Sequence, residues 1–273
     1  MLKTIKKITA PDYSGWIVVY TLLIILSTGC NTRIEGCLDV NAENFDLNGE
    51  RPCKDCCTYP MMQLSLTQKW NDANFSNDTT LYDEQLQPYF ITDLRYYLTT
   101  WSWIDDEGNQ FTVDSVEGDC NGSTLTYTPD ILIIDTRKFL YTLGTIRVAP
   151  HIVSLHASLG LTEDYSCLDE TDPQTPSVVT DQSPLWNTQT GKLETIRLIV
   201  QRDTSIESLD TIYIDYQLEN TLGYDYQLEN GKNTPLTLSV NYAQWFKDVN
   251  VDSLSSFETS LRNNIAGSIT RTP

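Results

Sequence analysis

From residue 61 onward, the chain is dominated by short segments in which apolar and polar residues alternate. A period of two places every second side chain on the same face of a β-strand. Valine, isoleucine, threonine and aromatic residues are frequent in these segments, as is typical of strands. The segments predicted to be strands are 61–68, 90–104, 110–115, 131–136, 151–159, 193–201, 210–218 and 235–245.

Turn-forming residues separate these segments, for example in the runs 105–109 and 230–233. Many short strands with few helical stretches are typical of an all-β fold. We therefore expect an antiparallel β-sandwich over residues 61–273, with one short C-terminal helix. A capping box at Ser255 and Glu258 indicates where this helix begins. Apolar residues recur at helical spacing at Leu254, Phe257, Leu261 and Ile265.

Three large aromatic residues occupy odd positions of the predicted strand 90–104, namely Tyr97, Trp101 and Trp103. Alternation in a regular strand points all three side chains to the same face. We expect them to form part of the core or to cover it.

Residues 1–29 have the pattern of an export signal. Lys3, Lys6 and Lys7 precede an apolar run of about a dozen residues, which is too short to span a bilayer. The residues "STGC" that end at Cys30 resemble the cleavage box of bacterial lipoproteins, in which the cysteine becomes the lipidated first residue. An ordinary secretory signal with an incidental cysteine is the alternative. We expect an exported protein that lipid on Cys30 anchors to the outer membrane, on its periplasmic or surface side.

An exported chain meets an oxidising environment, so its cysteines are expected to form disulfides. Once Cys30 is set aside, an even number of cysteines remains, as full pairing requires: Cys37, Cys53, Cys56, Cys57, Cys120 and Cys167. The first four lie in a turn-rich module, residues 30–60, and adjacent cysteines rarely bond each other. Two pairings are left: Cys37–Cys56 with Cys53–Cys57, or Cys37–Cys57 with Cys53–Cys56. Cys120 and Cys167 are expected to pair with each other.

The cysteine spacing of this module matches a zinc site less well than a set of structural disulfides. A zinc site usually shows two short Cys/His pairs separated by a loop, and here the first pair is missing. Asn44, Asp46, Asn48 and Gly49 have the spacing of the first positions of a calcium-binding EF-hand loop, with Asp55 at the closing position. Calcium binding is one interpretation, and a loop built on Asx turns is the other.

The net charge and the absence of catalytic motifs argue against several classes of function. The formal net charge of −19 argues against a nucleic-acid partner, because phosphate binding needs a basic face. The chain contains no nucleophile elbow, phosphate loop, zinc-protease motif or dinucleotide fingerprint, so no enzyme is predicted. It has two histidines, His151 and His156. Residues five apart in a continuous strand face opposite sides, so the two cannot share a metal without a bulge.

The cysteine-rich module resembles a short segment near the start of surface lipoproteins of the Bacteroidota. The resemblance implies that its cysteines are structural. The matching residues are Gly36, Cys37, Asp39, Ala42, Asn44, Phe45, Cys57, Tyr59 and Pro60.

The segment 89–115 is similar to a strand pair of MbnP-like proteins, and the similarity continues through 131–136, 140–164 and 183–200. It begins with Phe90, Leu94, Arg95, Tyr96, Tyr97, Leu98, Asp105 and Gly108. The resemblance implies a secreted β-sandwich, with copper bound beside an oxidised tryptophan and a dihaem peroxidase-like protein as partner.

Trp186, with Gly191 after it, corresponds best to that tryptophan, although Lys192 follows where the family has an aromatic residue or histidine. The metal-site residues implied are therefore His151, His156 and Trp186. Two functions are expected from the whole sequence. One is a cell-envelope lipoprotein that binds copper, and the other is a non-catalytic surface module, structural or interacting, with no metal.

Overall fold

The computed structural model describes residues 33–120, 122–127, 130–147, 151–161, 165, 177–202 and 209–271. The predicted export signal, Cys30 and Cys167 lie outside the described residues. The described chain forms two compact units, of which residues 33–38 and 46–56 make up the first and residues 39–45 and 57–271 the second. Within the described residues, every helix is too short or too polar to cross a membrane.

The first unit is built on two very short parallel strands, β1 (Glu35–Gly36) and β2 (Arg51–Pro52). The backbone amide of Cys53 donates to the carbonyl of Gly36 at 3.0 Å and extends this ladder by one hydrogen bond. A disulfide between Cys53 and Cys56 follows directly. This unit has little regular structure and is closed by a covalent link.

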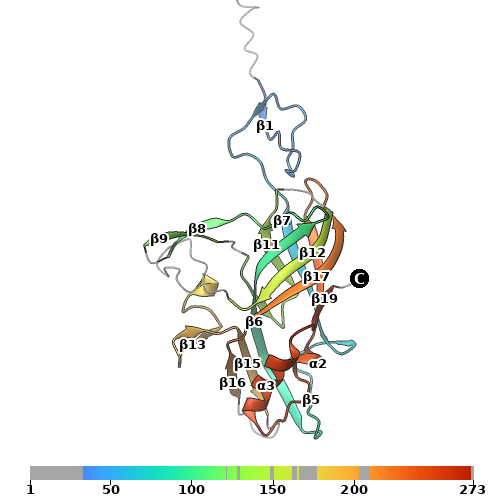
Figure 1. Ribbon diagram of the computed structural model, residues 1–273, viewed down its shortest axis with the longest axis vertical. Helices are drawn as coiled ribbons and strands as arrows, with labels where there is room; N and C mark the ends of the chain where they lie inside the picture. The colour runs from blue at the N-terminus through green and yellow to red at the C-terminus, as the bar shows by residue number, and fades with distance from the viewer. Residues whose placement is uncertain are drawn as a thin grey trace, which may run out of the picture. The chain divides into compact units, whose positions relative to one another are not determined.

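The second unit contains an eight-stranded sheet organised around one long strand, β6 (Pro88–Asp105). β6 is labelled near the middle of Figure 1. β6 pairs antiparallel with five strands: β5 (Leu81–Tyr82), β7 (Gln110–Phe111), β10 (Leu132–Asp135), β12 (His151–Leu159) and β15 (Ile196–Gln201). The sheet continues from β15 to β16 (Asp210–Ile214) and from β12 to β17 (Leu218–Gln227).

A five-stranded sheet forms the other layer around β3 (Met61–Trp70). Antiparallel partners of β3 are β4 (Ala73–Asn74) and β11 (Leu140–Thr145). β3 also pairs with β18 (Thr234–Asn241), and this pair is parallel. β19 (Ile269–Arg271) completes the sheet beside β18.

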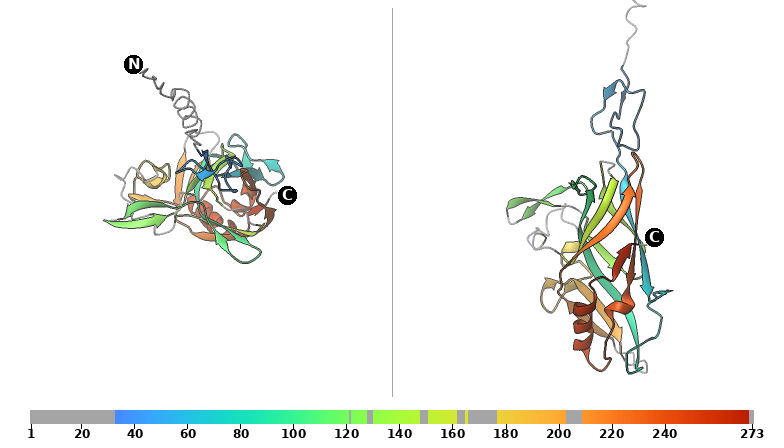
Figure 2. Two further views of the ribbon diagram at one scale, coloured as in Figure 1. Left: turned by 90° about the horizontal axis from the view of Figure 1, so that it is seen from above. Right: turned by 45° about the vertical axis from the view of Figure 1, so that its right-hand side comes forward.

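In the described part of this unit, two hairpins lie outside these sheets. The first is formed by β8 (Val116–Cys120) and β9 (Ser123–Tyr127), and it extends away from the sandwich (Figure 1 and Figure 2). The second is formed by β13 (Trp186–Asn187) and β14 (Lys192–Leu193). A single turn of 3-10 helix, η2 (Ser177–Val179), precedes the second hairpin.

The two sheets enclose one large apolar core, and the all-β sandwich expected from the alternation is confirmed. Met62, Leu64 and Leu66 alternate along β3 and are at most 1% exposed. β6 contributes Trp101 and Trp103, which are fully buried. Burial of apolar surface on this scale is the main favourable term in folding.

Two α-helices follow β18. The predicted C-terminal helix is confirmed as α3 (Leu254–Asn264), but its N-cap is Ser253, so the capping box at Ser255 and Glu258 is wrong. The strand predicted over 235–245 ends at Asn241, and α2 (Tyr242–Trp245) follows as an additional helix. The reason is local: the Asn241 side chain accepts a hydrogen bond from the Ala243 amide at 3.1 Å and caps α2.

The aromatic residues of β6 do not share one face, contrary to the prediction. Trp101 and Trp103 lie in the main core, whereas Tyr97 belongs to a smaller apolar cluster with Leu185. The cause is a bulge, because Thr100 and Trp101 together lie opposite the single residue Ala157 of β12. An extra residue in one strand moves all later side chains to the opposite face.

Candidate functional site

His151, the first predicted metal ligand, is held in a partly exposed ion pair at the start of β12. Its Nε2 lies 2.7 Å from Oδ1 of Asp225, and its Nδ1 lies 3.8 Å from Oδ2 of Asp106. The hydrogen bond with Asp225 raises the pKa of His151 above the ordinary value. The arrangement therefore favours a protonated imidazolium, which is a poor metal ligand.

His156, the second predicted ligand, has different partners. Its Nδ1 lies 3.0 Å from Oγ1 of Thr221, and its Nε2 lies 3.4 Å from Oγ of Ser154. Relative to β6, β12 does contain an extra residue between Ile152 and Ser154, a bulge of the kind that a shared metal would require. Even so, His151 and His156 each bond to their own neighbours.

Trp186 lies in another part of the second unit. The hydroxyl of Tyr213 donates to the carbonyl of Trp186 at 3.5 Å. Strand register places Tyr213 of β16 in the same row of the sheet as Arg95 of β6. His156 lies opposite Ser102 of β6, seven positions further along that strand. Seven strand residues span about 20 Å. The structure therefore does not bring Trp186 together with the histidines.

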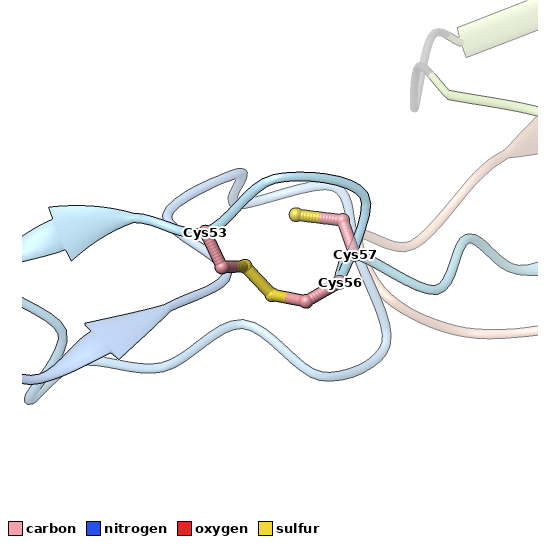
Figure 3. Close-up of side chains that lie close together, drawn as sticks. All are labelled: Cys53, Cys56 and Cys57. Atoms are coloured by element: carbon pink, nitrogen blue, oxygen red, sulfur yellow. A yellow bond between two sulfur atoms is a disulfide. The ribbon is translucent and has the colours of Figure 1, made fainter.

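The cysteines of the N-terminal module are disulfide-bonded, as predicted. The bonds are Cys53–Cys56 and Cys37–Cys57, the second of the two predicted pairings. The Sγ atoms of Cys53, Cys56 and Cys57 all lie within 4.8 Å of one another (Figure 3). Among the described residues, this is the one group of three or more His, Cys, Asp or Glu side chains with metal-binding proximity. Metals bind the thiolate form, so the oxidised module is not a thiolate site.

Cys120 is also disulfide-bonded, and its predicted partner Cys167 lies outside the described residues.

At the predicted calcium positions, side-chain oxygens accept backbone hydrogen bonds. Oδ1 of Asn44 accepts from the Thr58 amide at 2.8 Å, and Oδ1 of Asp46 accepts from the Asn48 amide at 2.9 Å. The second contact is an Asx turn, the alternative interpretation of this loop.

A polar hollow of about 280 Å³ opens beside His156 on the eight-stranded sheet. Strand register places Thr221, His156 and Ser102 in one row across β17, β12 and β6. We call this region the His156 hollow. It is lined by Thr100, Ser102, Ile104, Gln110, His156, Ala157, Ser158, Glu219 and Asn220.

Polar atoms of the His156 hollow are buried without hydrogen-bond partners in the described structure. They are Oγ1 of Thr100 and Nδ2 of Asn220. Ser102 is only 5% exposed. An unpaired buried donor or acceptor costs about 1–3 kcal/mol. Thr100 also has a φ of 52°, a conformation rare for a β-branched residue.

The pattern along the chain did not reveal this hollow. Its lining comes from β6, β7, β12 and β17, which are distant in sequence. Within each strand, the polar residues look like an ordinary solvent face. One local signal exists, because Thr99 and Thr100 interrupt the alternation of β6 at the bulge.

No protein family matches the chain, and no curated protein matches it. Among solved structures, MbnP from Methylosinus trichosporium is similar to it, at 10% sequence identity and a TM-score of 0.40. That similarity covers 70% of this chain and 78% of MbnP.

Proposed function

We propose that the protein is an exported, lipid-anchored protein of the cell envelope, and that its β-sandwich is a non-catalytic module that binds a small uncharged ligand in the His156 hollow. The observation that carries the proposal is the polar lining of this hollow, where the hydroxyl groups of Ser102 and Ser158 lie beside the imidazole of His156. The disulfide bonding of the cysteine-rich module supports an oxidising compartment.

The chemistry of the lining favours a ligand rich in hydroxyl groups. Thr100, Ser102 and Ser158 carry hydroxyls that both donate and accept, and Asn220 offers an amide donor. The net charge of −19 and the carboxylate of Glu219 at the hollow oppose an anionic ligand. A neutral saccharide unit offers both donors and acceptors and fits these requirements.

Copper and a dihaem peroxidase-like partner, which the family resemblance implies, are separate expectations. The hollow offers one imidazole, His156, and both of its nitrogens have hydrogen-bond partners. Copper prefers several imidazole, thioether or thiolate ligands. The three residues expected to bind it, His151, His156 and Trp186, do not converge, so they do not fit a copper site and the proposal includes none.

Saturation-transfer NMR on the full chain with Cys30→Ser tests ligand binding. Glucose, galactose and N-acetylglucosamine serve as probes. We expect saturation transfer to at least one of them and its loss in Ser158→Leu, which fills the His156 hollow. Ser255→Leu makes the same change on the exposed face of α3 and should bind like the parent. Absence of transfer to all three sugars, or unchanged transfer in Ser158→Leu, contradicts the proposal.

Native mass spectrometry after exposure to copper separates the two expected functions. Under the proposal, the desalted protein retains no copper. One tightly retained copper that is lost in His156→Ala would replace the saccharide proposal with a metal site.

Metabolic labelling with an alkyne analogue of palmitate tests the anchor. Label is expected on the wild-type chain and not on Cys30→Ala. Equal labelling of both chains, or of neither, would exclude lipidation of Cys30.

A further inference from the structure

The Cys53–Cys56 disulfide closes a much shorter loop than its neighbour. It joins cysteines three positions apart and encloses only Lys54 and Asp55. The stabilisation that a disulfide provides grows with the length of the loop it closes. A bond across two intervening residues therefore restrains the unfolded chain far less than Cys37–Cys57, which closes a loop of about twenty residues. The C-x-x-C spacing is also that of redox motifs.

The sulfur atoms also differ in accessibility. Cys56 is exposed, Cys53 and Cys57 are half-buried, and Cys37 is only 2% exposed. Thiol–disulfide exchange requires a thiolate to reach one sulfur of the bond. An external thiol therefore has access to Cys56 and little access to Cys37.

The backbone pairing next to this bond does not depend on it. The hydrogen bond from the Cys53 amide to the Gly36 carbonyl, at 3.0 Å, involves backbone atoms alone and does not require the disulfide. Exposed disulfides are more labile than buried structural ones.

From these observations we propose that Cys53 and Cys56 form a reversible thiol–disulfide exchange site for a dithiol protein of the envelope. A thiolate of the dithiol partner attacks Sγ of Cys56, the Cys53–Cys56 bond breaks, and Cys53 leaves as a thiolate that takes up a proton. The second thiolate of the partner then attacks the partner's first sulfur in the mixed disulfide. Cys56 is released as a thiolate and takes up a proton. Two electrons and two protons pass to the site, and the partner leaves as a disulfide.

Selective reduction is the first test. The full chain with Cys30→Ser is incubated under native conditions with increasing dithiothreitol, blocked with N-ethylmaleimide and mapped by peptide mass spectrometry. We expect Cys53 and Cys56 to be labelled at a dithiothreitol concentration at least tenfold below that needed for Cys37 and Cys57. Simultaneous opening of both bonds, or earlier opening of Cys37–Cys57, would overturn the proposal.

Capture of a dithiol protein is the second test. Thioredoxin that lacks its resolving cysteine is used as the probe, and the adduct is quenched with N-ethylmaleimide. The expected adduct is a mixed disulfide at Cys56, absent from the double variant Cys53→Ser, Cys56→Ser. An adduct at Cys37 or Cys120 instead, or equal adduct in the double variant, would contradict the proposal. Neither test uses saccharide binding, so this site stands or fails separately from the His156 hollow.

Discussion

The two compact units of this chain are stabilised by different means. In the small unit, residues 33–38 and 46–56, the strand ladder is two residues long and apolar side chains stay outside: Leu47 is 85% exposed and Ile34 is 53% exposed. In the sandwich, large side chains such as Trp101 are fully buried. A segment as short as the small unit cannot bury enough apolar surface to offset its chain entropy. The small unit therefore has a disulfide, Cys53–Cys56, where the sandwich has a core.

The largest expected effect concerns the core of the sandwich. Trp101→Ala removes a fully buried indole, so we expect a loss of about 3–5 kcal/mol in the free energy of unfolding. Urea unfolding followed by far-ultraviolet circular dichroism measures this loss. Leu47→Ala, in the small unit, should change the same free energy by less than about 0.5 kcal/mol. A comparable loss of unfolding free energy in both variants would contradict the claim that the sandwich depends on a buried core and the small unit does not.

A smaller effect is expected from charge buried in the sandwich. The side chain of Asp93 is 9% exposed and forms ion pairs with Arg95 at 3.2 Å, with Arg137 at 3.1 Å and with Arg197. Asp93→Asn removes the carboxylate that pairs with Arg197, while Arg95 and Arg137 keep their ion pairs with Asp135, and we expect a cost of about 2–3 kcal/mol in urea unfolding.

Asp114→Asn is the matched control for Asp93→Asn. Asp114 pairs with Arg147 at 3.0 Å, but its side chain is 42% exposed. Solvent screens this pair, so the expected cost is below about 1 kcal/mol. Equal costs in unfolding free energy for the two variants would mean that burial does not strengthen the ion pairs of Asp93.

The smallest effect is a pH dependence at His151. Its pKa is raised above 6.5 by the hydrogen bond with Asp225, so its contribution to stability is complete below pH 6.5 and is lost as the pH rises through the raised pKa. Compared with His151→Gln, the wild-type chain should therefore lose stability as the pH increases above 6.5. Thermal unfolding between pH 5 and 9 measures the difference. Asp225→Asn should weaken it, because Asp106 alone then raises the pKa of His151, and an undiminished dependence in this variant would assign it to another group.

Several elements could be predicted because their signal is local. The alternation of residues 61–68 predicted β3, and Phe257, Leu261 and Ile265 predicted the apolar face of α3. α2 was missed because Tyr242–Trp245 continues the apolar pattern of β18, and a single turn of helix is too short to show its own period.

The sequence predicted the cysteine pairing only in part. Sequence spacing excluded a bond between Cys56 and Cys57 and left two pairings, because the loops that these two pairings close differ in length by only one residue. The fold of the loop chose Cys53–Cys56 by placing those two sulfurs together.

The sequence by itself determined the all-β class, the position of most strands and the disulfide bonding of the cysteine-rich module, because alternation, turn residues and cysteine spacing act between near neighbours in the chain. The tertiary structure alone decided strand register, the bulge at Thr100 and the convergence of Ser102, His156 and Glu219 in one hollow. The physical reason is that register depends on contacts between strands far apart in sequence, and a one-residue shift exchanges the faces of all later side chains. No pattern along a single strand encodes that exchange.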